Sequence, residues 1–220
     1  RQHAGLLAKR DNAEHMRRLK ELKIQTIDVV IVNLYPFKQT VMSGKGFDEV
    51  VENIDIGGPT MLRSAAKNSG DVVVLTDPAD YEKALSELEA GEVSRETRLY
   101  LMYKVYAHTA AYDSMISAYL AKKLGIDFPD SLTLAFEKKE QLRYGENPFQ
   151  QAALYTDMFP VSNSIVNARQ ENGKQLSYNN LNDSNGAIEL LKEFDEPTVV
   201  AVKHSNPCGV ASGATIAEAY

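Results

Sequence analysis

The chain of 220 residues is long enough for one large domain or two modest ones, and its 44% hydrophobic and 25% charged residues are typical of a globular protein. Its net charge of −6 and the lack of a basic block argue against nucleic-acid binding. One cysteine excludes an intramolecular disulfide, no zinc-type Cys or His spacing occurs, and no apolar run could span a bilayer, so we expect a cytoplasmic, metal-free protein.

The first half of the sequence predicts alternating helices and strands. We expect, in order, a surface helix over residues 6–22, a buried strand over 27–32, helices over 47–54 and 61–68, a buried strand over 72–75, and helices over 79–88 and 95–124. The two strands are rich in β-branched residues, as in a parallel sheet covered on both faces. This order predicts βαβ winding.

Gly125 occupies a helix-ending position and is followed by turn-forming residues, which predicts a domain boundary between ranges 1–130 and 131–220. Beyond it we expect strands over 132–136 and 152–155 and a buried strand over 198–202. An amide-rich loop is predicted over 175–182, with Asp183 capping the helix that follows.

Lys203 and His204 come directly after the last predicted strand, and a turn at Asn206-Pro207 would let both face a cleft. Imidazole suits proton transfer near neutral pH, and a neighbouring cation favours its neutral, basic form. A solvated strand end explains the pair equally well. We interpret Cys208 as a small packing residue.

Other candidate residues lie on turns and at strand ends. Arg143 and Tyr144 could clamp a phosphate, although an ordinary surface turn is the alternative. Tyr35, Asp55 and Lys67 could relay protons only if the fold brings them together. Gly57 and Gly58 follow Ile56 and form a glycine pair. This pair would leave backbone N–H groups free for an anion or a developing oxyanion.

Five separated strings of the sequence resemble the family of bifunctional AICAR transformylase/IMP cyclohydrolase enzymes of purine synthesis. They are Gly5–Asp11, Val32–Phe37, Ile54–Gly58 together with Ala65–Asn68, Leu142–Pro148, and Val202–Val210. Their common order makes the resemblance far more specific than a single glycine motif.

The resemblance implies a methylglyoxal-synthase-like, parallel-sheet α/β domain, followed by the first part of a cytidine-deaminase-like α/β transformylase domain that lacks zinc. The second domain is expected to transfer a formyl group from 10-formyltetrahydrofolate to AICAR. The first domain is expected to close the product, FAICAR, to IMP with loss of water. Family members are homodimers, so a homodimer is expected.

For ring closure, the resemblance implies a nucleotide site in the first domain. Tyr35, Asp55 and Lys67 match the proton-handling positions of the family, without individual acid or base roles. The other matches are Asn33 and Leu34, which are expected to line the base pocket, and Ile56, Gly57 and Gly58, which are expected to line the nucleotide and supply N–H groups to the oxyanion.

For formyl transfer, His204 matches the general base of the family, and Lys203 matches the residue that stabilises charge and assists protonation of the folate leaving nitrogen. Arg143, Tyr144 and Asn180 match positions that contact AICAR.

Two departures from the family pattern affect these expectations. Phe149 stands where the family commonly has His, so a polar role of that side chain does not carry over. Phosphate-binding stretches are expected before Arg1 and folate-contacting residues after Tyr220, so we expect the chain alone to be inactive. The alternatives are a non-catalytic or single-activity nucleotide-binding module with a methylglyoxal-synthase-like fold, and a structural interaction protein.

Overall fold

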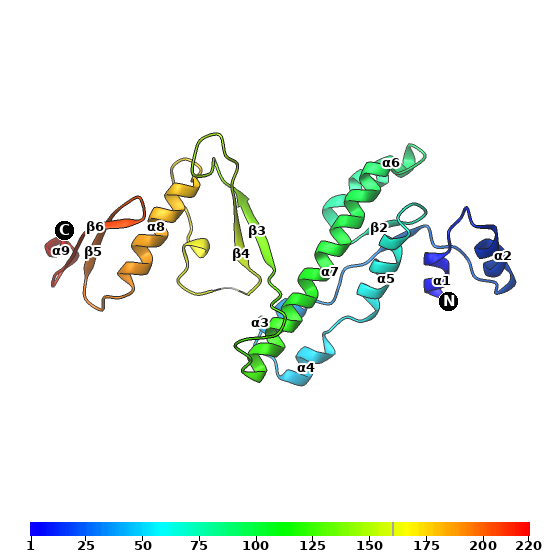
Figure 1. Ribbon diagram of the computed structural model, residues 1–220, viewed down its shortest axis with the longest axis horizontal. Coiled ribbons are helices and arrows are strands. Elements are labelled where there is room, and N and C mark those ends of the chain that lie inside the picture. Colours follow the sequence, from blue (N-terminus) through cyan, green and yellow to red (C-terminus); the bar gives the residue numbers. More distant parts are fainter. Residues whose placement is uncertain (160) are drawn as a thin grey trace. The chain divides into compact units, whose positions relative to one another are not determined.

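The computed structural model describes residues 1–159 and 161–220, which form two compact units, Arg1–Ala135 and Phe136–Tyr220 (Figure 1). Each unit combines helices with small sheets, so the predicted mixed α/β class is confirmed. The boundary between the two units lies a few residues after the predicted domain boundary. That the two activities also divide there stays a prediction.

The first unit contains most of the helices. In chain order its elements are α1 (Gln2–Leu7), α2 (Ala13–Glu21), β1 (Val29–Ile31), α3 (Phe37–Met42), α4 (Phe47–Glu52), α5 (Gly57–Lys67), β2 (Val73–Leu75), the 3-10 helix η1 (Pro78–Asp80), α6 (Tyr81–Glu89) and α7 (Arg95–Leu124). β1 and β2 pair in parallel, with α3, α4 and α5 in the connection between them. The predicted βαβ winding is therefore confirmed.

The core of the first unit lies where α5 and α7 pack against β2. All three residues of β2 are buried, as predicted. The prediction of a fully buried first strand over 27–32 was wrong, because β1 is shorter and only Val30 of its three residues is buried. Side chains alternate along a strand, so Val29 and Ile31 point to the face of the sheet opposite Val30, where they are exposed.

Residues 6–22 form two helices rather than the single predicted one. The chain leaves the helical conformation at Ala8, and Asn12 starts α2 by accepting hydrogen bonds from the N–H groups of Glu14 and His15 at 3.0 and 3.1 Å. The predicted helix over 61–68 begins earlier, at Gly57. The one predicted over 79–88 divides into η1 and α6, because Asp77 caps a 3-10 turn that starts with Pro78.

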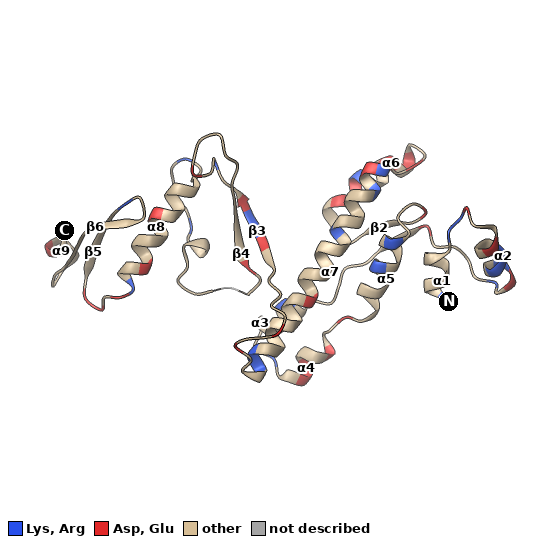
Figure 2. Ribbon diagram, viewed as in Figure 1, with Lys and Arg blue, Asp and Glu red and all other residues tan. Residues whose placement is uncertain are grey.

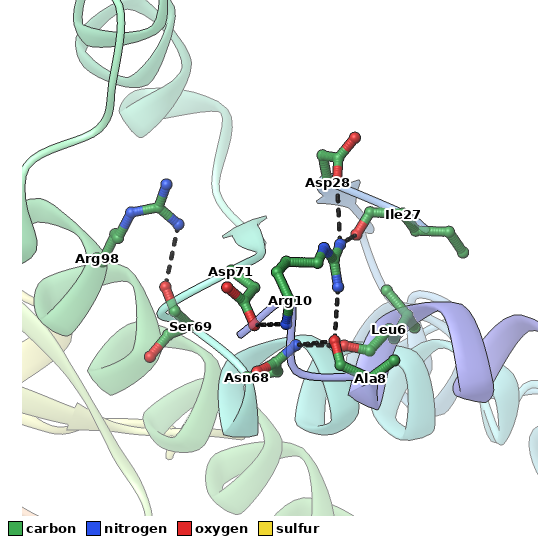
Figure 3. A network of polar contacts seen from close by, with 9 residues as sticks. All are labelled: Leu6, Ala8, Arg10, Ile27, Asp28, Asn68, Ser69, Asp71 and Arg98. Atoms are coloured by element: carbon green, nitrogen blue, oxygen red, sulfur yellow. Dashed lines mark hydrogen bonds and ion pairs between the residues drawn. The ribbon is translucent and has the colours of Figure 1, made fainter. Parts of the chain in front are cut away.

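A network of polar contacts holds the break between α1 and α2 (Figure 3). The Arg10 guanidinium donates to the carbonyl oxygens of Ala8 and Ile27 at 2.8 and 2.9 Å and pairs with Asp28 at 3.0 Å. The Arg10 N–H donates to Asp71 at 3.0 Å. Further contacts run from Asn68 to the carbonyl oxygens of Leu6 and Ala8, and from Arg98 to that of Ser69. These contacts thus supply donors to the Leu6 and Ala8 carbonyl groups, which the end of α1 would leave unpaired.

α7 has the predicted bounds. Ser94 caps its first turn by accepting a hydrogen bond from the N–H of Thr97, and Gly125 ends it in the left-handed conformation at φ +66°. Along its length, buried residues such as Leu101, Val105 and Tyr112 contact the core. No helix within residues 1–159 and 161–220 has the length and apolar composition needed to cross a membrane.

The second unit contains two antiparallel strand pairs and one long helix. Its elements are β3 (Phe136–Gln141), β4 (Ala153–Asp157), η2 (Ile165–Asn167), α8 (Tyr178–Leu191), β5 (Thr198–Lys203), β6 (Asn206–Ser212) and α9 (Ile216–Ala219). β3 pairs with β4, and β5 pairs with β6. Figure 2 shows both signs of charge on β3, as on α2 and α6.

Three predicted elements of the second unit need correction. The strand expected over 132–136 begins where that range ends, because Leu132 and Leu134 are exposed and β3 is formed by backbone pairing of charged residues. The loop expected over 175–182 is helical from Tyr178, since Ser177 caps α8 instead of Asp183. β5 is buried only at Thr198, so its apolar run is partly exposed.

The Arg10 contacts predict a stability effect. Replacing Arg10 with Met keeps an apolar stem but leaves the Ala8 and Ile27 carbonyl groups without their charged donor, so the free energy of unfolding should fall by about 2 kcal/mol in urea titration. Arg17→Met, which removes an exposed i,i+4 pair on α2, should change it by less than about 0.5 kcal/mol. Equal losses in both variants would contradict a special role for Arg10.

Candidate active sites in the two units

Asp55 joins two segments of the first unit that were both predicted to carry site residues. Its carboxylate accepts hydrogen bonds from the backbone N–H of Tyr35 at 3.2 Å and from that of Gly58 at 2.8 Å. Its own N–H donates to the Tyr112 hydroxyl at 2.8 Å, and that hydroxyl donates to the Asn53 carbonyl oxygen at 3.2 Å. Asp55 therefore fixes the loop after β1 against the start of α5.

The glycine pair was predicted to lie ahead of a helix, but it lies inside the first turn of α5. Gly58 is packed closely, because a Cβ atom there would lie 2.7 Å from both Leu34 Cδ2 and Asp55 Oδ2, whereas a Cβ at Gly57 would meet nothing within 4 Å. The Gly58 N–H already has an acceptor in Asp55. Ile56 and Gly57, the other two residues expected to supply N–H groups, are exposed.

Asn33 is held at the carboxyl ends of β1 and β2, where open α/β sheets usually bind ligands. Its side-chain Nδ2 donates to the Thr76 carbonyl oxygen at 3.1 Å, and its Oδ1 accepts from the Tyr81 hydroxyl at 3.5 Å. Thr76 Oγ1 is buried without a hydrogen-bond partner among the described residues. Leu34, next in the chain, packs against the core and Gly58. Nothing in the spacing of the sequence signalled Thr76 or Tyr81.

Lys67 does not join Tyr35 and Asp55. It lies at the opposite end of α5, about 15 Å along the helix axis from Gly57 at 1.5 Å per residue. It lines a cavity of about 350 Å³ that extends along α5 from Thr60 to Lys67 and also includes Leu7, Arg63, Ser64 and Tyr106. The structure therefore brings together only two of the three expected proton-handling residues, and of Tyr35 it is the backbone that contacts Asp55.

Lys104 forms an ionic cluster that the sequence analysis did not identify. Its ammonium group contacts Asp77 at 2.5 Å and Asp80 at 2.6 Å, which fixes η1 against α7. The hydrogen bond from Lys104, and then the one from the Ala79 N–H, hold the pKa of Asp77 below its ordinary value of 3.8. Burial lowers the pKa of Lys104, but its hydrogen bonds to the two carboxylates outweigh that effect and raise it. Burial also lowers the pKa of His108, one turn along α7.

In the second unit, the start of α8 contacts the loop that bears Arg143 and Tyr144. The Tyr178 N–H donates to the Tyr144 carbonyl oxygen at 3.1 Å, and the Arg143 N–H donates to the Leu176 carbonyl oxygen at 3.0 Å. The Arg143 guanidinium lies 4.8 Å from the centroid of the Tyr144 ring and donates to its hydroxyl at 3.2 Å. The loop also lines a cavity of about 440 Å³ that includes Gly145, Gln150 and Tyr178.

Asn180 lies in the first turn of α8, where it completes a capping box with Ser177. The Asn180 side-chain oxygen accepts from the Ser177 N–H at 3.1 Å, and the Ser177 hydroxyl accepts from the Asn180 N–H at 3.4 Å. Such reciprocal bonds satisfy two donors that a helix start leaves unpaired. The exposed Asn180 side chain is thereby fixed close to the Tyr144 loop.

Lys203 and His204 stand at the tip of the β5–β6 hairpin. Lys203 ends β5 and pairs with Asn206, so the turn consists of His204 and Ser205 instead of the predicted Asn206-Pro207. His204 and Ser205 have φ of +53° and +61°, as a type I′ hairpin turn requires. This left-handed conformation costs about 1–2 kcal/mol for each residue other than glycine. Both Lys203 and His204 are exposed, and Cys208 is exposed on β6.

A cluster of three or more His, Cys, Asp or Glu residues that could bind a metal ion is absent from the described part of the chain.

Comparisons with known proteins identify the class and then the family. The family model described as the MGS-like domain matches residues 3–60, which defines the class of the first unit. The model described as the AICARFT/IMPCHase bienzyme matches residues 65–220, more than half of the chain. The chain belongs to the AICARFT/IMPCHase bienzyme family. The resemblance carried by the five strings is thus confirmed.

Two PurH relatives agree with this assignment. The chain is 58% identical over 221 aligned residues to the "Bifunctional purine biosynthesis protein PurH" of Ruminiclostridium cellulolyticum and to that of Acetivibrio thermocellus. These alignments cover 99% of this chain and 43% of each relative, so the chain spans less than half the length of these relatives. A solved structure described as "Crystal structure of ForH" is 36% identical, with a TM-score of 0.45, over 52% of this chain and 60% of that one.

The two glycines predict different effects of an added methyl group. Gly58→Ala should lower the free energy of unfolding by about 1–3 kcal/mol, because the new Cβ would overlap Leu34 and Asp55. Gly57→Ala is the matched control, since nothing lies within 4 Å and Ala favours helix, so it should be neutral or slightly stabilising. Urea titration measures the free energy of unfolding of both variants. A value for Gly58→Ala equal to that of wild type would contradict the packing argument.

The Asp77–Lys104 contact predicts a pH-dependent stability. Because the folded pKa of Asp77 lies below the unfolded one, the contact stabilises the fold above about pH 4, and that contribution disappears as the pH falls through the folded pKa. The stability difference between wild type and Asp77→Asn should therefore shrink between about pH 6 and pH 2. Asp130→Asn, at an exposed carboxylate, provides the control. A difference for Asp77→Asn that stays constant with pH would contradict the contact.

Proposed function

We propose that the complete protein containing this chain is a bifunctional enzyme of de novo purine synthesis. Its second domain transfers the formyl group of 10-formyltetrahydrofolate to the 5-amino group of AICAR. Its first domain closes the resulting FAICAR to IMP with loss of water. Support comes from family membership, and from one observation above all: α8 contacts both the Arg143–Tyr144 loop and the His204 turn, and itself contains Asn180.

For formyl transfer, the proposed base is His204. An aromatic amine is a weak nucleophile, so removing its proton while the tetrahedral carbon forms makes the attack easier. The exposed imidazole at the hairpin tip is accessible to such a substrate. Lys203 is proposed to stabilise the developing negative charge and to assist protonation of the folate nitrogen as the C–N bond breaks. Arg143, Tyr144 and Asn180 are proposed to bind AICAR.

For ring closure, the carboxamide nitrogen attacks the formyl carbon, so the site must remove a proton and hold an oxyanion. We assign the oxyanion to the N–H groups of Ile56 and Gly57 and the base pocket to Asn33 and Leu34. Asp55 orients this pocket, because its carboxylate is occupied by the Tyr35 and Gly58 N–H groups. Gly58 contributes to this pocket because its lack of a side chain lets Leu34 pack closely against α5.

Tyr35 is proposed to take part in the proton transfer of ring closure, and Lys67 is proposed to contact a different part of the nucleotide. The Tyr35 side chain is exposed beside the Asp55 junction, and Lys67, at the other end of α5, lines the cavity that extends along this helix. Within this proposal the two residues act on different parts of the nucleotide. The complete protein is further proposed to be a cytoplasmic homodimer, for which the exposed Leu99, Tyr100 and Tyr103 of α7 offer an apolar surface.

The base role of His204 is tested in the complete protein. His204→Ala should lower the kcat of formyl transfer by about 10²–10⁴-fold, as expected for loss of a general base, and should leave the ring closure of added FAICAR unchanged. His15→Ala, at an exposed histidine of α2, should retain both activities. Near-normal transfer by the His204 variant would remove the assignment, and loss of both activities would point to misfolding instead of a lost base.

A further inference from the structure

The turn that carries His204 needs outside support, because its two residues, His204 and Ser205, adopt the left-handed backbone conformation. Residues in such conformations persist where the surroundings hold them. Within the hairpin, the Asn206 side chain donates to the His204 carbonyl oxygen at 2.9 Å. The remaining support comes from α8.

Three residues on one side of α8 contact Ser205. The Asp183 carboxylate accepts a hydrogen bond from the Ser205 N–H at 2.7 Å and lies 3.4 Å from the Ser205 hydroxyl. The Asn182 side chain donates to that hydroxyl at 2.6 Å. Gly186 has no side chain, so the backbone of Ser205 can approach α8 closely: a Cβ at Gly186 would lie 3.2 Å from the Ser205 carbonyl oxygen.

The imidazole of His204, in contrast, makes no hydrogen bond to any residue within 1–159 and 161–220. Its direction therefore depends on the backbone of the turn and not on a side-chain partner. Asp183 carries a charge and makes a short bond to the N–H that follows His204, so among the α8 contacts it has the strongest hold on that backbone.

We infer that Asp183 is a positioning residue for His204, acting through the backbone N–H of Ser205. The inference rests on the proposed role of His204 as the base of formyl transfer. Asp183 does not touch the reacting atoms. It keeps the imidazole in the place from which the base can reach the amine, and small misplacements of a catalytic group can reduce rates by up to about 10²-fold.

The test compares Asp183→Ala with Asp183→Asn in the complete protein. Alanine removes the acceptor of the Ser205 N–H, so kcat of formyl transfer should fall by about tenfold or more, while the KM for AICAR changes by less than about threefold. Asparagine keeps an oxygen acceptor and should restore kcat to within about threefold of wild type. Asp195→Ala, an exposed carboxylate after the end of α8, should behave as wild type.

A second readout does not depend on activity. Hydrogen exchange of the Ser205 amide should become at least about tenfold faster in Asp183→Ala and stay slow in Asp183→Asn. Ring closure of FAICAR should be unchanged in both variants. Unchanged exchange and kcat in Asp183→Ala would overturn the inference, as would equal damage in the alanine and asparagine variants.

The His204→Ala variant separates the two possible failures. If His204→Ala abolishes transfer while Asp183→Ala does not affect it, the positioning role is wrong and the base role stands. If His204→Ala retains transfer, the base role is wrong and the positioning role falls with it.

Discussion

Aspartate carboxylates hold the backbone N–H groups at the bends of this chain, and the arrangement of both candidate sites depends on that interaction. Asp55 accepts from the loop after β1 and from the start of α5, Asp77 from the turn after β2, and Asp183 from the tip of the β5–β6 hairpin. Each bend lies at or near the end of a strand, where the ladder no longer supplies a partner. Gly58 is buried and Ser205 is half-buried, so their N–H groups would be costly to leave without an acceptor, and the aspartate carboxylates supply one.

This interaction changes how Asp55 is understood. The family resemblance gives Asp55 a part in proton relay and orientation, and the hydrogen bonds that both of its carboxylate oxygens accept from backbone N–H groups favour the orienting part. Lys67 lies at the other end of α5, so the three expected residues of the first unit do not form one cluster. In the second unit, α8 contacts two segments that lie about sixty residues apart in sequence, the Tyr144 loop and the His204 turn.

The sequence predicted well the elements whose signals are local. α7 has its expected bounds because a serine cap and a terminal glycine enclose an uninterrupted helical pattern, and the parallel pairing of β1 and β2 follows from the order of strands and helices. The start of α8 was missed because asparagines at 179 and 180 indicate a loop, while the capping box that stabilises them uses Asn180 in place of the usual Glu or Gln. The hairpin turn was misplaced because Asn206-Pro207 carries the stronger turn signal. Left-handed His204 and Ser205 depend on α8, which no local pattern reveals.

β3 has a consequence for how molecules of this protein meet one another. All six of its residues are exposed, and Lys138, Lys139 and Glu140 follow one another along the strand. A two-stranded sheet offers its outer edges to strands of other molecules, which is the first step of ordered aggregation. Adjacent charges oppose such contact, because pairing would strip them of water. The charges of β3 therefore disfavour edge-to-edge pairing of this exposed strand with a strand of another chain.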